Sequence, residues 1–335
     1  MPVLLLRMFV AFAIALTCVA KGHSQTATIE DPTSNQDLIK AENSSLDPLA
    51  INQQVPDSKH VVKLLGKCDL TGLQEAPYSD WFTAGFDHYL VDSDMLDRCK
   101  DKLENIRIVV FMGTWCEDSQ QQVPRFVKVM NYLGITPSRL QLTCIDYVPG
   151  RYKRSPFGEE AAFGIHRVPA IIVFRGEKEL GRMVESPVTS LEVDLAQMLH
   201  DMAPSPKYAL VPKVQALIAE RGAKHVLENM EHLSKEFAGI DRGFSELNTL
   251  AKVYSDCQQF QEALAILKLN ATLHSQDAKA IFELGMGYSR TGQVDVALIQ
   301  LAKSITLNPC DPEAAKQLER LSQAMSQAMS QADQR

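Results

Sequence analysis

The chain has 335 residues, 45% of them apolar, which is typical of a globular protein with room for two ordinary domains. A formal net charge of -7 gives it no general attraction for nucleic acids or anionic membrane surfaces, and no long basic run supplies one locally. The sequence also lacks glycine-rich phosphate loops, the zinc-protease helix motif and the serine-hydrolase elbow. We therefore expect no cofactor, no metal site and no nucleic-acid partner.

The N-terminus is typical of a secretory signal peptide. Arg7 precedes an apolar run over residues 8–20 that is too short to cross a bilayer easily, and the small residues Gly22 and Ser24 follow. We expect residues 1–24 to be removed on export, which predicts a periplasmic or secreted bacterial protein with no membrane span after removal. Two alternatives stay open, an uncleaved anchor and a lipid attached at Cys18.

Residues 25–58 are predicted to be a linker or disordered spacer, because they are rich in Ser, Asn, Asp, Gln and Pro without a sustained apolar period. The first domain is expected over residues 59–203, with its core at about 77–200. It contains an aromatic cluster at roughly helical spacing, which we interpret as core packing: Trp81, Phe82, Phe86 and Tyr89.

From Ile106 onward the pattern predicts an α/β fold. Strands are expected at 107–112, 139–146, 170–174 and 180–184, and helical segments at 119–133, 159–163 and 190–200. The order β-α-β-α-β-β-α predicts a central mixed sheet flanked by helices, and connections through helices favour parallel pairing of the first strands. This order is also that of a thioredoxin fold.

A short motif stands where the first of these strands meets its helix. It reads Gly-Thr-Trp-Cys-Glu-Asp-Ser over residues 113–119, and Pro124 follows eight residues after Cys116. The motif resembles the W-C-x-x-C active site of thioredoxins, and the later stretch with Val168 and Pro169 resembles their cis-proline loop. The resemblance covers about 77–200 and implies a thioredoxin-like fold with thiol–disulfide exchange chemistry.

The resemblance also implies roles for individual residues. Cys116, with Trp115 and Ser119 beside it, would be the reactive thiol, because the first turn of a helix favours a thiolate. Val168 and Pro169 would dock an extended peptide substrate, and Arg167 would project near the thiolate as a cationic stabiliser. The two acidic residues 117 and 118 oppose that stabilisation.

Two departures from the thioredoxin pattern predict monothiol chemistry. Ser119 stands where the resolving cysteine would be, so a mixed disulfide on Cys116 lacks its usual discharge. Val110 stands where thioredoxins have a buried acid. Isomerisation, exchange with a small thiol, or capture of a partner cysteine then become the expected reactions. A degenerate scaffold that merely retains the cysteine is the alternative.

The other cysteines are harder to interpret. Export would leave six cysteines in an oxidising compartment, where Cys68 and Cys99 flank one segment and could pair. Cys144 and Cys257 are interpreted as small buried hydrophobic residues. Cys144 is also the alternative resolving thiol, but we expect it to be buried and too far from Cys116.

Residues 204–335 are predicted to be all helical, with an internal repeat of 34 residues. The repeated positions, which pair in order, are Leu247, Leu250, Ala251, Tyr254, Ala263 and Leu267 with Ile281, Leu284, Gly285, Tyr288, Ala297 and Leu301. The pattern resembles tetratricopeptide (TPR) repeats, with units at 244–277 and 278–311. An atypical helix pair is expected before them and a capping helix after them.

Two functions remain open from the sequence. The first is an exported thiol–disulfide exchange protein whose TPR repeats recruit a protein or peptide partner on their concave face. The second is a non-enzymatic adaptor whose repeats carry the function. The concave positions are Asn248, Lys252, Phe282 and Met286. The sequence names neither the thiol- or disulfide-containing substrate, whether protein or small thiol, nor the electron donor.

Overall fold

The computed structural model describes residues 46–57, 62–204 and 207–332, which form two compact units divided between Gln215 and Ala216. The first unit is α/β and the second is all helical, as the sequence predicts at that level. Within the described ranges, every helix is too short or too polar to span a bilayer. The predicted signal peptide, residues 1–24, lies outside these ranges, as does most of the predicted linker.

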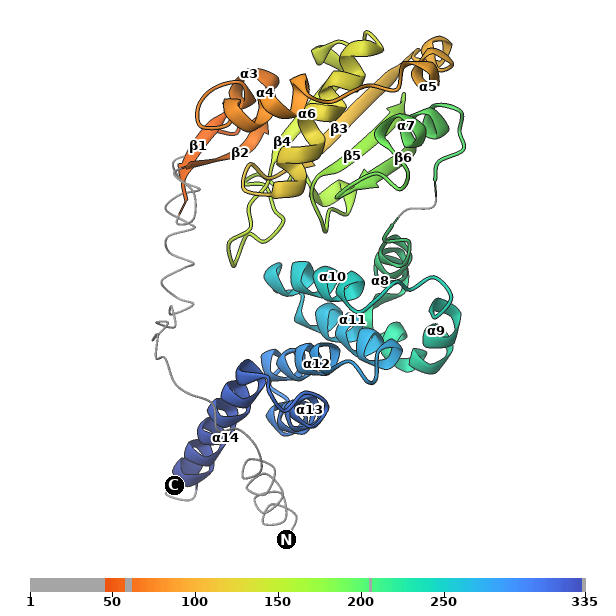
Figure 1. Ribbon diagram of the computed structural model, residues 1–335. Helices are drawn as coiled ribbons and strands as arrows, with labels where there is room; N and C mark the ends of the chain where they lie inside the picture. The colour runs from red at the N-terminus through yellow and green to blue at the C-terminus, as the bar shows by residue number, and fades with distance from the viewer. Residues whose placement is uncertain (1–45, 58–61, 205–206, 333–335) are drawn as a thin grey trace. The chain divides into compact units, whose positions relative to one another are not determined.

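A six-stranded mixed sheet forms the centre of the first unit, with strand order β1-β2-β4-β3-β5-β6 (Figure 1). β3 and β4 pair in parallel, and every other neighbouring pair is antiparallel. β3 lies inside the sheet and is buried along almost all its length, which explains its continuous apolar sequence. The strands are β1 (Gln53–Pro56), β2 (Val62–Cys68), β3 (Ile106–Met112), β4 (Leu140–Cys144), β5 (Ala170–Arg175) and β6 (Lys178–Val184).

The end of the predicted linker is wrong, because the sheet begins inside it. Gln53–Pro56 form the edge strand β1, which pairs antiparallel with β2. The sequence pattern missed this strand because only Val55 is buried and its other three residues are polar or proline. An edge strand with one buried side chain carries no alternating apolar signal.

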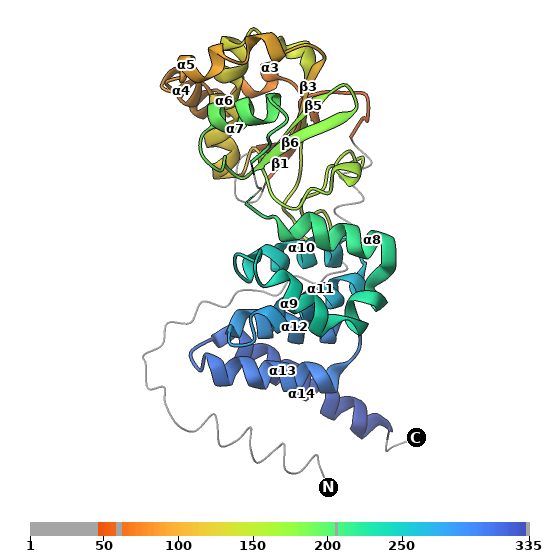
Figure 2. The same cartoon turned by 90° about the vertical axis from the view of Figure 1, so that its right-hand side faces the viewer.

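One face of the sheet is covered by helices. Figure 2 shows α4, α6 and α7 on the same side of the sheet, and their apolar side chains share one core with it, including Phe82, Phe126 and Leu195. The predicted aromatic cluster packs in or against this core. The helices of this unit are α3 (Leu70–Leu73), α4 (Ser79–Asp87), α5 (Ser93–Asp97), α6 (Glu117–Tyr132) and α7 (Leu191–Leu199).

The other face carries a smaller core. Val109, Phe111 and Ile172 pack there against Ile165 and Val168, which belong to the long connection between β4 and β5. Only a short 3-10 turn, Ala161–Phe163, forms where the sequence predicts a helical segment at 159–163. The β4–β5 connection therefore covers this face and brings its own residues to the end of β3.

A buried carboxylate organises the start of that connection. Asp146 is fully buried, and its Oδ1 lies 2.7 Å from Lys63 Nζ while its Oδ2 lies 3.0 Å from Arg151 Nη2. Both cations are almost fully buried as well. Asp146 Oδ1 also accepts hydrogen bonds from the backbone N–H groups of Tyr147 and Val148. The carboxylate thus joins β2 to a loop far away in sequence.

We predict that Asp146→Asn lowers the free energy of unfolding of this unit by about 3–5 kcal/mol, because it leaves two buried cations without their counter-charge. Urea unfolding followed by tryptophan fluorescence measures this unit, since both tryptophans, Trp81 and Trp115, lie in it. The matched control is Asp201→Asn, whose exposed carboxylate also pairs with two cations, Arg175 and Lys178. Equal effects of the two substitutions would contradict the prediction.

The second unit consists of helices in sequence-adjacent pairs. α8 runs across the division between the units and contains a non-helical residue, Gly222, so it consists of two helices that meet at a kink. The helices are α8 (Leu210–Glu228), α9 (Met230–Phe237), α10 (Ser245–Asp256), α11 (Phe260–Leu273), α12 (Ala278–Arg290), α13 (Val294–Leu307) and α14 (Pro312–Ala332).

The 34-residue period is visible in the hydrogen bonds of the second unit. Asn270 Nδ2 donates to the Phe244 carbonyl at 2.8 Å, and the Ser304 hydroxyl donates to the Ala278 carbonyl at 2.8 Å. Both donors and both acceptors are 34 residues apart. Each bond ties the second helix of a pair to the start of the first, so α10–α11 and α12–α13 are two copies of one structural unit.

The turns inside the two helix pairs also correspond. Gln258 and Gly292, again 34 residues apart, both have a left-handed backbone, with φ of 61° and 78°. Glycine adopts this conformation at no steric cost, whereas glutamine adopts it at a steric cost from its Cβ. After the second pair, Leu318 of α14 packs against Leu298 and Leu301 of α13, so α14 covers the end of the repeat.

Candidate thiol site

Cys116 stands at the boundary between β3 and α6. Its backbone is extended, with φ of -96° and ψ of 120°, and the helix begins at the next residue, Glu117. The side chain is half-buried. Because the first N–H groups of a helix have no partner within the helix, they present partial positive charge at this end. The strand-to-helix junction predicted from the sequence is therefore present, with the cysteine at its tip.

The loop before β5 lies against this sulfur. The Cys116 thiol donates to the carbonyl oxygen of Val168 at 3.4 Å, and the peptide bond between Val168 and Pro169 is cis. The Pro169 carbonyl is already occupied, since it accepts the backbone N–H of Glu185 at 2.8 Å. The structure thus brings together three of the residues that the sequence predicted as a site, Cys116, Val168 and Pro169.

Trp115 forms the wall beside the cysteine. Its indole N–H donates to the Ile145 carbonyl at 2.9 Å, and its ring centroid lies 4.9 Å from that of Tyr147. The ammonium of Lys153 lies 4.5 Å from the ring centroid. Gly113 allows the indole to approach closely, because a Cβ at that position would lie 2.4 Å from the ring. Trp115 is thereby held by the β4–β5 connection.

Ser119 lies in the interior, where its hydroxyl has a structural role. It is fully buried, and its Oγ accepts the backbone N–H of Gly113 at 3.3 Å. The hydroxyl therefore ties the first turn of α6 to the end of β3. The Gln120 side chain adds a second tie, since its amide donates to the Thr114 carbonyl at 2.7 Å.

Arg167 is paired with a carboxylate. Its guanidinium lies 2.7 Å from Glu185 Oε1, and it stacks over the ring of Tyr208 with 4.5 Å between Cζ and the ring centroid. The Tyr208 hydroxyl donates to the other carboxylate oxygen of Glu185. Sequence reasoning missed Glu185, Tyr208 and Lys153, because each reaches the site from a distant part of the chain.

Two carboxylates near the start of α6 have shifted pKa values. Partial burial raises the pKa of Asp118, and the negative charges of Glu185 and Glu117 add to the rise. Burial would also raise the pKa of Glu185, but hydrogen bonds from Tyr208 and Arg167 outweigh it and lower that pKa. Charges of both signs thus act on Asp118, two residues after the cysteine.

The remaining cysteines of the α/β unit lie away from Cys116. Cys144 is fully buried in the core on the helix-covered face, where burial and a hydrogen bond with Cys68 raise its pKa well above the usual value. Cys144 therefore cannot reach Cys116 as a resolving thiol. Cys68 and Cys99 are free thiols and are not joined to each other.

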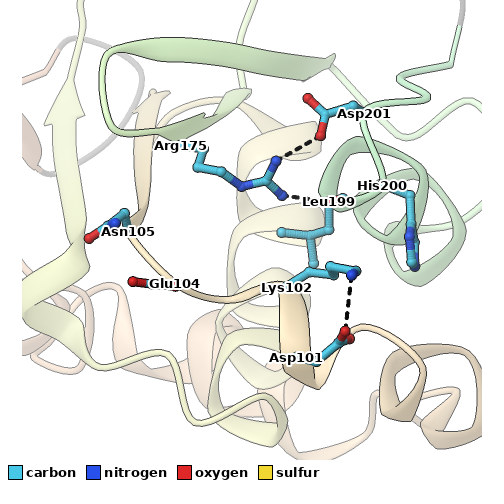
Figure 3. Close-up of a pocket in the computed structure, with 8 residues that line it drawn as sticks. All are labelled: Asp101, Lys102, Glu104, Asn105, Arg175, Leu199, His200 and Asp201. Carbon is cyan, nitrogen blue, oxygen red and sulfur yellow. Dashed lines mark hydrogen bonds and ion pairs between the residues drawn. The ribbon is translucent and has the colours of Figure 1, made fainter.

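A second surface feature lies at the opposite end of the sheet. The pocket in Figure 3 is lined by residues that precede β3, by the last residue of β5 and by the end of α7 with the two residues after it, whereas Cys116 follows β3. Two ion pairs lie within it, Arg175 with Asp201 and Lys102 with Asp101. None of the predicted site residues lines it. Across the described ranges, no cluster of His, Cys, Asp and Glu side chains has the arrangement of a metal site.

No protein-family model matches the chain, and no curated protein matches it.

A buried histidine supports the loop that faces Cys116. His166 packs edge-on against Tyr208, with 5.7 Å between ring centroids, and burial together with the neighbouring Arg167 charge lowers its pKa to about 3. The His166 ring is therefore neutral in the folded protein at ordinary pH. An unfolded chain would protonate it at its ordinary pKa of about 6.5.

This difference predicts an acid sensitivity. As the pH falls below about 6.5, His166 becomes protonated in the unfolded state but stays neutral in the folded state. Its contribution to the free energy of unfolding is therefore complete above that pH and is lost progressively toward pH 3. Between pH 7 and pH 5 the loss is about 2 kcal/mol. Urea unfolding at both pH values should show it in the wild type and in the exposed-histidine control His88→Gln, but not in His166→Phe. An equal loss in all three proteins would refute the assignment.

Proposed function

We propose that the chain is a thioredoxin-like thiol–disulfide exchange protein that uses Cys116 as its only site thiol. The observation that supports this best is the position of the cysteine. Its sulfur lies at the start of α6 and contacts the Val168 carbonyl of a loop with a cis-proline. A sulfur there is favoured as the thiolate by the helix start and lies beside backbone that an extended substrate can bind.

In the proposed reaction the Cys116 thiolate attacks one sulfur of a substrate disulfide. A new disulfide forms between Cys116 and the substrate, the old S–S bond breaks, and the second substrate sulfur leaves as a thiolate. That thiolate, or a small thiol from solution, then attacks the mixed disulfide and restores Cys116. If a different cysteine thiolate of the substrate attacks the mixed disulfide, a new substrate disulfide forms, Cys116 leaves as a thiolate, and the substrate is isomerised with no net oxidation.

Ser119 accounts for the proposed restriction to monothiol chemistry. A thioredoxin would place its second thiol at this position, and here a buried hydroxyl accepts a hydrogen bond from Gly113 instead. The mixed disulfide then persists until another thiol arrives. Such persistence suits isomerisation or capture of a partner better than rapid reduction.

We further propose that the helical unit is a short TPR-type array that recruits a protein or peptide partner, and that the protein acts after export. The two equivalent carbonyl contacts at Asn270 and Ser304 support the repeat assignment. Phe282 and Met286 lie one turn apart on α12 and remain partly exposed beside a small apolar cluster. An apolar strip of this kind suits an apolar helix or extended segment of a partner.

We predict that Ser119→Cys raises turnover of a small model disulfide with dithiothreitol as donor by roughly tenfold or more, because a neighbouring thiol attacks at high effective concentration. Cys116→Ser should abolish turnover in the same assay. Cys99→Ser, at a buried cysteine away from the site, is the matched control and should behave as the wild type. A wild type as fast as Ser119→Cys would show that another thiol already resolves Cys116.

A partner-capture experiment separates exchange from a purely adaptor function. Disulfide-linked partners should be recovered from host extract on the wild-type chain and on the double variant Phe282→Ala/Met286→Ala, with the second yield several-fold lower because the recruiting contact is lost. Cys116→Ser should recover none. If instead Cys116→Ser supports the full cellular phenotype while the double variant does not, the adaptor function is correct.

A further inference from the structure

Glu185 occupies an unusual backbone position next to the proline loop. It follows β6 with φ of 62°, in the left-handed region that non-glycine residues rarely adopt. Its N–H donates to the Pro169 carbonyl at 2.8 Å, so the strained residue is fixed against the loop that contacts Cys116. The carboxylate then extends back toward Arg167, two residues before that proline.

Tyr208 holds the carboxylate from the other side. Its hydroxyl donates to Glu185, and its ring lies against Arg167. The same ring makes a T-shaped contact with His166. The adjoining residues of α8 are firmly packed, since Leu210, Val211 and Val214 are fully buried and Gln215 donates to the Gly164 carbonyl at 3.2 Å. The start of α8 therefore packs against the connection that leads to the cis-proline loop.

We propose that Glu185 is a positioning residue that attenuates Cys116, because its carboxylate neutralises Arg167, the cation nearest in sequence to the Val168 carbonyl that the thiol contacts. Arg167 alone would stabilise the thiolate. Paired with Glu185 and stacked on Tyr208, it contributes little net charge. This inference deepens the proposed exchange function, since it names what limits the reactivity of the same sulfur.

The other charges near α6 do not replace this effect. Glu117 and Asp118 lie on its first turn, and the charges of Lys207 and Lys153 reduce, without reversing, the rise in the pKa of Asp118. Lys153 also acts on Glu185. The charges of the two acids and the two lysines therefore cancel, and the charges of the Arg167–Glu185 pair cancel separately. Removing one member of that pair changes the net charge beside Cys116 by one unit.

The test is the rate of Cys116 alkylation by iodoacetamide across pH, read on the Cys116 peptide by mass spectrometry in the full chain. The reagent is neutral, so the rate follows the thiolate fraction, and iodide leaves as the C–S bond forms. Glu185→Gln should raise the rate at pH 6 by roughly threefold or more, and Arg167→Gln should lower it by a similar factor. The double variant should return to the wild-type rate.

Glu179→Gln is the matched control, because Glu179 is also a β6-region glutamate paired with an arginine, Arg182. It should leave the rate unchanged. Tryptophan fluorescence confirms that each variant is folded, and Arg167→Gln keeps the test decisive if Glu185→Gln unfolds. A Glu185→Gln rate equal to that of the Glu179→Gln control, or a double variant that stays away from the wild-type rate, overturns the proposal.

Disulfide exchange is measured on the same proteins to separate the two proposals. If alkylation follows the predicted order but no variant exchanges with a model disulfide, the attenuation by Glu185 holds and the proposed exchange function fails. If exchange occurs in the wild type but alkylation ignores Glu185, the function stands and this inference fails.

Discussion

The buried carboxylate of Asp146 fixes one side of the Cys116 site, and much of that side would lose its position without it. The carboxylate binds Lys63 and Arg151 and the first amides of its own loop. The backbone N–H of Lys153 in turn donates to the Asp146 carbonyl, so the loop closes on itself. Tyr147 and Lys153 are thereby held against the indole of Trp115, which itself bonds to Ile145. A buried cluster of charges therefore determines the shape beside a half-buried thiol.

The opposite side of the thiol is built differently. Arg167, Glu185 and Tyr208 form a network that is only partly buried, and the chain that supplies Tyr208 continues into α8. Water screens such a network more than the Asp146 cluster, so its contribution to stability is smaller and its charge balance is easier to change. The site thus combines a rigid wall with an adjustable one, an arrangement that lets reactivity change without unfolding the sheet.

Local signals explain what could be predicted from the sequence. The apolar run of β3 leads to Trp115 and Cys116, and a helix starts at the cysteine. The thiol could therefore be placed at a strand-to-helix junction from the sequence alone. The 34-residue period is also a local sequence signal, and it located the corresponding helices of the two pairs. Partners separated by long stretches could not be found, since Lys63 lies 83 residues from Asp146. Arg167 could be located two residues before Pro169 from the sequence alone, but the carboxylate that pairs with it could not, because its approach depends on how the chain turns after β6 at Glu185.

The paired contacts at Asn270 and Ser304 have a consequence for how this chain can change over evolution. Each contact closes one helix pair onto its own start and makes no demand on the length of the rest of the array. Duplication or loss of a 34-residue segment would therefore leave every remaining contact in register, whereas an insertion inside one helix pair, between donor and acceptor, would place a wrong side chain opposite the carbonyl. The helical half can vary its reach in whole steps while the sheet that carries the thiol stays constant.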